Sequence, residues 1–281
     1  MKNIKQELPP YEEIQSYDKV IDHIKNANET LKNSLIDAIK KLHPEQAFAI
    51  SDEKSESCVR FLNSFLSNSN NGNVFTTNYD LLLYWVLMRM LNTSDKDKIC
   101  DGFGRDTEDG ELSELRWGKN SGTQSIYYLH GALHLFDTGI EIVKEEYDTQ
   151  HYLLQKINER MKKKEYPIFV TAGSGDDKLA HIMHNKYLSY CYDKLSAIEG
   201  SLIVYGFGFG KYDDHIIKAI NKAGENRRDK DGKWHMLHSV YIGLYSKDDY
   251  KHINQIKDQF KVPIRVFKAE TTNVWGEKKP Y

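Results

Sequence analysis

Hydrophobic positions recur at helical spacing through the first part of the chain. Two sets of apolar residues, each spaced by three or four positions, lie before Pro44. They are Ile14, Tyr17, Ile21 and Ile24, followed by Leu31, Leu35, Ile39 and Leu42. Residues at this spacing share one face of an α-helix. The pattern predicts two successive amphipathic helices, and a third over residues 59–66, within an amino-terminal helical segment over residues 1–72.

From residue 73 onward, short β-branched and aromatic runs alternate with helical patterns. These runs lie at residues 74–77, 125–129, 167–170, 201–205, 239–242 and 264–267. Strands that alternate with helices are typical of crossover units, which build a parallel sheet. The sequence predicts an α/β protein whose domain at 73–281 is a Rossmann-like, mostly parallel sheet flanked by helices. Residues 101–122, with glycines and mixed charge, are expected to form an insertion or loop.

Composition narrows the classes of partner. The 39 basic and 41 acidic residues nearly cancel, so nucleic-acid binding is not expected without a local basic patch. The three cysteines form no CxxC pair, which argues against a disulfide framework and a cysteine zinc site. No apolar run reaches the length of a membrane span, and the amino terminus has no apolar signal core. We expect a cytoplasmic protein without membrane contact.

The first candidate for chemistry follows the run at 74–77, where Asn78 and Asp80 precede an apolar helical segment at 81–90. Ligands of open α/β sheets bind at the carboxyl ends of strands, and a helix start adds free N–H donors. Both residues are also favoured helix caps. As ligands, the amide could hold a hydroxyl or a water and the carboxylate could accept from an amide NH2. Both interpretations remain open.

His130 ends the aromatic run at 125–129 and is followed by Gly131, which lets another group approach closely. An imidazole titrates near neutral pH and can act as a general base, although a histidine at a strand end can equally be structural. His134 follows His130 by four residues, so the two could form a pair of metal ligands on one face if the segment is helical. We predict no metal site, because HGALH lacks the acid and the third ligand of a metal-binding helix.

A glycine-rich loop at 206–210 follows the run at 201–205. Its backbone amides could approach a nucleotide, and Asp213 or Asp214 could cap the next helix. Its spacing is not GxGxxG, so the loop indicates a nucleotide site only in combination with the motifs at the other two strand ends.

These motifs, in this order, resemble the sirtuin-like family, and most closely the bacterial sirtuin-like NAD+ hydrolases of antiviral defence. The resemblance implies that Asn78 orders the nicotinamide ribose and the attacking water, that Asp80 lies near the carboxamide, and that His130 is catalytic. It makes NAD the substrate. It also implies further cofactor-binding positions: Thr77, Gly131, Gly206, Gly208 and Phe209.

The chain departs from the family at two places. It has no glycine before Gly72, so the glycine-rich phosphate loop is missing, and Gly208 stands where the family has a serine or threonine. Three explanations remain open: the first strand and loop were lost, another chain or an upstream segment supplies the donors, or the protein is a non-catalytic relative.

The resemblance therefore predicts an NAD+ hydrolase that releases nicotinamide and ADP-ribose, as an antiviral effector gated by a homo-oligomer or by a neighbouring-gene regulatory protein. The alternative is a nucleotide-binding or scaffolding subunit of a complex.

Overall fold

The structure is a computed structural model that describes residues 11–42, 49–66, 72–90, 99–105, 114–147, 152–170, 173–228, 231–232 and 234–276. Backbone contacts divide the chain into two units, Met1–Pro44 and Glu45–Tyr281. The sequence placed this boundary at residue 72. The shift arises because the helix at 52–66 packs on the following helix and strand, and so belongs to the second unit.

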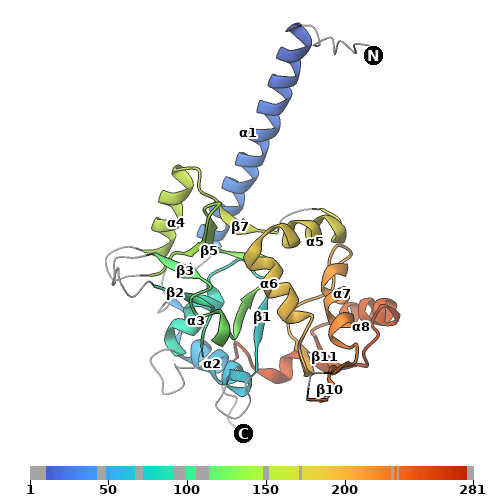
Figure 1. The fold of residues 1–281 in the computed structure, drawn as a ribbon. Helices are drawn as coiled ribbons and strands as arrows, with labels where there is room; N and C mark the ends of the chain where they lie inside the picture. Colours follow the sequence, from blue (N-terminus) through green and yellow to red (C-terminus); the bar gives the residue numbers. More distant parts are fainter. Residues whose placement is uncertain are drawn as a thin grey trace, which may run out of the picture. The chain divides into compact units, whose positions relative to one another are not determined.

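The α-helices of the described residues are labelled in Figure 1: α1 (Tyr11–Leu42), α2 (Asp52–Leu66), α3 (Leu82–Met90), α4 (Leu153–Lys162), α5 (Gly175–His184), α6 (Lys186–Leu195), α7 (Asp214–Ala223) and α8 (Lys247–Ile256). Short 3-10 helices are η4 (Ser121–Thr123), η5 (Lys257–Gln259) and η6 (Ala269–Thr272). The strands are β1 (Val74–Thr76), β2 (Phe103–Gly104), β3 (Leu115–Trp117), β4 (Ile126–Tyr128), β5 (Gly131–Asp137), β6 (Ile142–Lys144), β7 (Pro167–Phe169), β8 (Gly200–Val204), β9 (Arg227–Arg228), β10 (Trp234–His235), β11 (Leu237–Leu244) and β12 (Ile264–Lys268).

The first unit contains one continuous helix, α1, where the sequence predicted two. The prediction of a break was wrong because nothing between Ile24 and Leu31 stops a helix. That stretch contains neither glycine nor proline, and the spacing of apolar residues continues across it.

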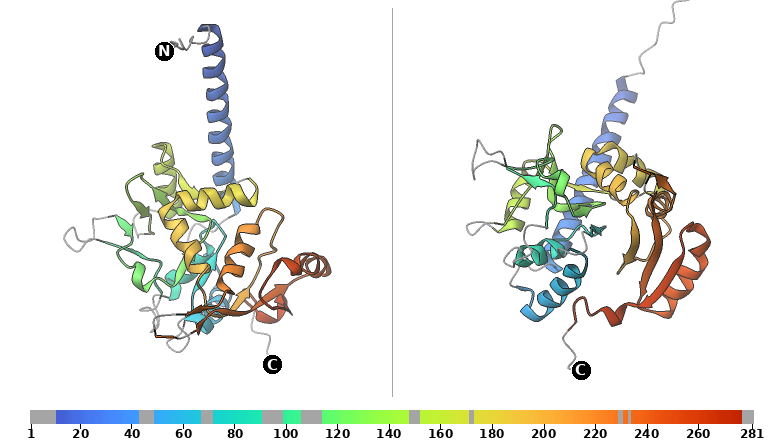
Figure 2. Two further views of the ribbon diagram at one scale, coloured as in Figure 1. Left: turned by 45° about the vertical axis from the view of Figure 1, so that its right-hand side comes forward. Right: turned by 60° about the horizontal axis from the view of Figure 1, so that its bottom comes forward.

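In the second unit, two groups of strands are parallel, as predicted. β1 pairs with β4, and the rings of Phe75 and Tyr127 stack across the pair with centroids 4.8 Å apart. β8, β11 and β12 form a three-stranded sheet in the order β12-β11-β8. Figure 2 shows α8 beside this sheet, where it contacts β11. The protein is therefore a mixed α/β protein with parallel sheets flanked by helices.

The expectation of one mostly parallel sheet is wrong for the middle of the chain. β7 pairs antiparallel with β5, in a sheet of order β2-β3-β6-β5-β7. The predicted insertion at 101–122 contains β2 and β3 of the same sheet, although residues 106–113 lie outside the described part. β5 and β6 are antiparallel because only residues 138–141 connect them, and a tight turn joins antiparallel strands.

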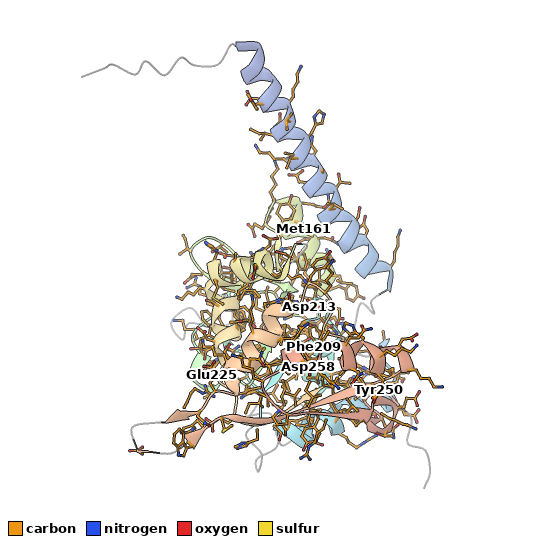
Figure 3. The ribbon with its side chains drawn as sticks, turned by 90° about the vertical axis from the view of Figure 1, so that its right-hand side faces the viewer. Met161, Phe209, Asp213, Glu225, Tyr250 and Asp258 are labelled. Atoms are coloured by element: carbon orange, nitrogen blue, oxygen red, sulfur yellow. The ribbon has the colours of Figure 1, made fainter. Side chains whose placement is uncertain are left out.

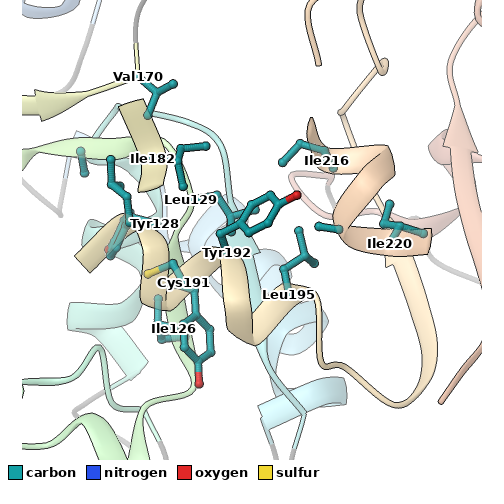
Figure 4. Packing of buried hydrophobic residues seen from close by; sticks show 14 of the residues in the cluster. Ile126, Tyr128, Leu129, Val170, Ile182, Cys191, Tyr192, Leu195, Ile216 and Ile220 are labelled. Atoms are coloured by element: carbon teal, nitrogen blue, oxygen red, sulfur yellow. The ribbon is translucent and has the colours of Figure 1, made fainter. Parts of the chain in front are cut away.

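Helices α5, α6 and α7 contact one another, and α6 also contacts β4. Figure 4 shows apolar side chains from these elements converging, among them Ile182, Tyr192 and Ile216. Two side-chain caps fix the first two helices: Ser174 forms a capping box at α5, and Asn185 accepts from two backbone N–H groups at α6. This packing brings the start of α7 towards the end of β4. Among the described helices, none is long and apolar enough to cross a membrane.

Candidate active site

His130 lies where β4 and β7 end. It follows β4 by two residues, and its carbonyl oxygen accepts a hydrogen bond of 3.0 Å from the backbone N–H of Val170, the residue after β7. Its side chain reaches α7, where its Nε2 lies 2.8 Å from Nε2 of His215. Only 4 % of His130 and none of His215 is exposed. The structure thus joins His130 to a second, buried imidazole.

The sequence interpretation missed His215. It is the second residue of α7, and its backbone carbonyl accepts a 3.1 Å hydrogen bond from the hydroxyl of Tyr192 in α6. The two imidazole rings lie 5.0 Å apart between centroids. One Nε2 must donate while the other accepts, so the rings have opposite protonation at these atoms. A histidine on the apolar face of an amphipathic helix gives no local signal that separates it from a core residue.

Both imidazoles are neutral at physiological pH. Burial lowers the pKa of His130 to about 4, helped by the neighbouring His215 and the charge of Lys178. Burial likewise lowers the pKa of His215 to about 4, against an opposing effect of Asp213. A neutral imidazole has a lone pair with which to accept a proton, and a hydrogen-bonded pair can pass a proton from one ring to the other. The pair can therefore act as a general base, although a pKa of about 4 makes each ring a weaker base than a free imidazole.

An ion pair borders the two histidines. Nζ of Lys178 in α5 lies 2.8 Å from Oδ1 of Asp213, and both side chains are more than four-fifths buried. Oδ2 of Asp213 accepts a 3.2 Å hydrogen bond from the backbone N–H of Gly210. Figure 3 labels Asp213 beside Phe209, on the segment that connects β8 to α7. The pair therefore ties α5 and α7 to the glycine-rich loop.

The segment after β1 contacts the same region. Thr76 of β1 is in register with Tyr128 of β4, so Asn78 and His130 each lie two residues beyond a paired position. The ring of Tyr79 lies 6.4 Å from that of His130, and the Tyr79 hydroxyl donates to the carbonyl of Val170. Asn78 is exposed, and its backbone N–H donates to the Thr76 hydroxyl. The parallel register of β1 with β4 therefore places the ends of these two strands side by side.

The structure gives Asp80 a local backbone contact and leaves Thr77 half-buried. Oδ1 of Asp80 accepts a 2.9 Å hydrogen bond from the backbone N–H of Leu82, the first residue of α3. This contact confirms the capping role that the sequence left open for Asp80, without testing its role as a ligand. Thr77 is half-buried between Thr76 and Asn78.

Gly131 lies directly against the backbone of β7. Its φ of +84° is one that side-chain-bearing residues rarely adopt, and a Cβ there would lie 2.0 Å from the carbonyl oxygen of Ile168. The expectation that Gly131 admits a close neighbour is confirmed, and that neighbour is the backbone of β7.

The glycine-rich loop is open at two of its positions. Gly206 and Gly208 are exposed, and a Cβ on either would meet no atom within 4 Å. The ring of Phe209 instead packs edge-on against Phe207 and Phe260 and is only 2 % exposed. Any contact of Phe209 with a nucleotide would therefore come from its backbone, whose carbonyl oxygen lies 2.9 Å from Nε2 of His252.

The possible metal pair of His130 and His134 is not supported by the local structure. Gly131–Asp137 is a strand, so the helical i, i+4 spacing that suggested the pair does not exist. Within the described ranges, no three His, Cys, Asp or Glu side chains lie close enough together to hold a metal ion.

A family model described as a domain of unknown function, DUF4917, matches residues 11–275. The chain belongs to this family. No curated protein matches the chain. The DUF4917 domain thus begins at the first residue of α1 and includes both histidines of the pair.

A third imidazole of the DUF4917 domain, His134, is completely buried against the rings of Tyr84 and Tyr128. Neither of its nitrogens has a hydrogen-bond partner among the described residues. Burial, with the charge of Lys144, holds its pKa well below the usual value. The folded protein therefore resists protonation at a pH where the unfolded chain accepts it.

This difference predicts acid lability. Because the pKa of His134 is lower in the folded state, its contribution to stability is present above its unfolded pKa, near 6.5, and is lost as the pH falls below it. His134→Leu should reduce the slope of unfolding free energy against pH below 6.5 by up to ~1.4 kcal/mol per pH unit. Urea unfolding at several pH values measures both slopes. Equal slopes would contradict the prediction. His130 and His215, whose pKa values are also lowered, should contribute to the remaining slope.

Proposed function

We propose that this DUF4917 protein is a sirtuin-like NAD+ hydrolase with a Rossmann-like arrangement of its parallel strands. The observation that carries the proposal is the buried, neutral pair of His130 and His215 at the strand edge to which Asn78 also belongs. A general base that is already neutral needs no prior loss of a proton at physiological pH.

The proposed reaction breaks the bond between the nicotinamide nitrogen and C1′ of the ribose. The bonding electron pair leaves with nicotinamide, and a water oxygen bonds to C1′ to give ADP-ribose. His130 takes the proton that the water loses, and its contact with His215 offers that proton a second ring. Asn78, exposed at the end of β1, would orient the ribose hydroxyls and the water. The transition state resembles a ribosyl cation, so binding that holds the ring and shelters the leaving group is required.

The nucleotide itself would lie along the loop at 206–210. The exposed backbone at Gly206 and Gly208 supports this placement, since no bulky group covers it. Backbone N–H groups in such loops are common donors to phosphate oxygens. Lys178 lies near the same loop through its contact with Asp213, whose carboxylate balances its charge.

Control of the activity is part of the proposal. Unrestrained hydrolysis of NAD+ would damage the host cell, so we propose an antiviral effector that is activated by assembly or by a neighbouring-gene protein. This element is based on the resemblance to sirtuin-like defence proteins.

The second candidate is a nucleotide-binding or scaffolding subunit without turnover. The near-complete burial of His130 favours it, together with the absence of any glycine before Gly72. Calorimetric titration with NAD+ and ADP-ribose distinguishes its two forms. Heat of binding without turnover would favour a nucleotide-binding subunit, and no heat with either compound would leave only a scaffold.

The deciding experiment is incubation of the purified protein with NAD+, alone and with the neighbouring gene product. We expect nicotinamide and ADP-ribose to appear in equal amounts. NAD+ that stays intact in every mixture would exclude the hydrolase in favour of the second candidate.

A further inference from the structure

The helix α1 carries a seven-residue repeat along its whole length. Starting at Ile14 as position a, apolar residues occupy eight of the nine a and d positions up to Leu42, and the ninth is Asn28. The a positions are Ile14, Ile21, Asn28, Leu35 and Leu42, and the d positions are Tyr17, Ile24, Leu31 and Ala38. A period of 3.5 residues keeps one apolar seam straight only when helices supercoil around each other.

The seam is exposed wherever its side chains are described. Tyr17, Ile21, Ile24 and Leu31 are between 47 and 69 % exposed. Large apolar side chains that line up on one exposed helix face mark an interaction surface. The separate unit formed by α1 is therefore built to pack on another helix.

We propose that this partner helix is α1 of a second copy of the chain, in a parallel two-stranded coiled coil. The single asparagine at an a position, Asn28, favours a parallel pair of α1 helices over an antiparallel one. In a parallel pair, a positions face a positions, so Asn28 meets its own counterpart, and a single asparagine at position a specifies two strands and one register. In an antiparallel pair, a positions face d positions, and Asn28 would meet an apolar residue.

Charge on the helix is compatible with self-association. Residues 11–42 contain six acidic and five basic residues, so two copies do not repel each other through net charge. The near balance also leaves α1 with no strong net charge that would call for an oppositely charged partner. The proposal does not depend on the hydrolase activity, because it concerns only the association of α1.

Light scattering on the full-length chain tests the proposal. The wild type should have the mass of two chains, and the pair of d-position substitutions Ile24→Asp and Leu31→Asp should halve it. The matched control, Asn26→Asp with Asn33→Asp, adds the same two charges at f positions on the opposite face and should leave the dimer intact. A monomeric wild type, a mass unchanged by the d-position pair, or a mass other than two chains would overturn the proposal.

Register and direction are tested by cross-linking in a Cys100→Ser background, since the other two cysteines, Cys58 and Cys191, are buried. Ile21→Cys at position a should give a covalent dimer under mild oxidation, because parallel helices bring the two introduced thiols together. Asp22→Cys, one residue away at position b, should give none. An antiparallel or shifted pair would leave Ile21→Cys without a cross-link, which would overturn the parallel arrangement.

Discussion

Replacing His130 by alanine is expected to slow the release of nicotinamide from NAD+ by about 10²–10⁴-fold, the usual contribution of a general base. The proposed base is lost, while the backbone contact between His130 and Val170 remains. Initial rates at saturating NAD+, with nicotinamide measured by chromatography, give the ratio. Turnover that survives at the wild-type rate would remove His130 from the mechanism.

His215 provides the more specific comparison, as a residue expected to position His130 and adjust its pKa. His215→Gln removes one of the groups that hold the pKa of His130 low, so that pKa should rise from about 4. Because the base must be unprotonated, the acid limb of kcat/KM should move to higher pH.

Tyr192→Phe is the control for packing around α7. It removes only the hydroxyl that donates to the His215 carbonyl and leaves the imidazole pair in place. We expect the acid limb to stay where it is in the wild type. If Tyr192→Phe and His215→Gln give the same profile, His215 acts only through the packing of α7.

Gly131→Ala is expected to destabilise the second unit by roughly 3–5 kcal/mol, at the upper end of single substitutions. The methyl group would collide with the carbonyl oxygen of Ile168, and the φ of +84° would add strain. β7 would have to move away, and with it the N–H of Val170 that holds His130. Urea unfolding followed by tryptophan fluorescence measures the loss.

The turn between β5 and β6 offers a matched control. Gly139 has nearly the same φ, +83°, but a Cβ there would meet no atom within 4 Å. Gly139→Ala should therefore cost only the backbone strain, about 1–2 kcal/mol. Equal losses for the two variants would show that the approach of β7 is not what requires glycine at 131.

Local patterns in the sequence were sufficient for the parallel parts of the fold. A β-branched or aromatic run that ends in polar residues has one favourable arrangement, a buried strand that leads into a turn or helix. This is why β1 and β4 lie within the strands that the sequence predicted, and their parallel pairing agrees with the predicted alternation of strands and helices. The cap formed by Asp80 is equally local, since its partner is the backbone N–H two residues on.

Other elements were decided by contacts between distant segments. β7 carries the same kind of apolar run as the parallel strands, and only its neighbour β5 makes it antiparallel. The continuity of α1 is instead a local property that the sequence interpretation missed, because no glycine or proline lies between Ile24 and Leu31. The boundary between the two units depends on which elements α2 packs against.

The histidine pair shows most clearly which features the sequence determined and which features the tertiary packing determined. The sequence by itself determined that His130 would stand at the end of a strand, because the residues around it set the strand and the turn. Its partner His215 lies 85 residues further along, on a helix face whose pattern marks only burial. Sequence patterns report which side chains leave water, whereas the packing of α7 against α6 and α5 decides which two of them meet. The tertiary structure alone therefore joined the two imidazoles, and their shared burial lowered both pKa values.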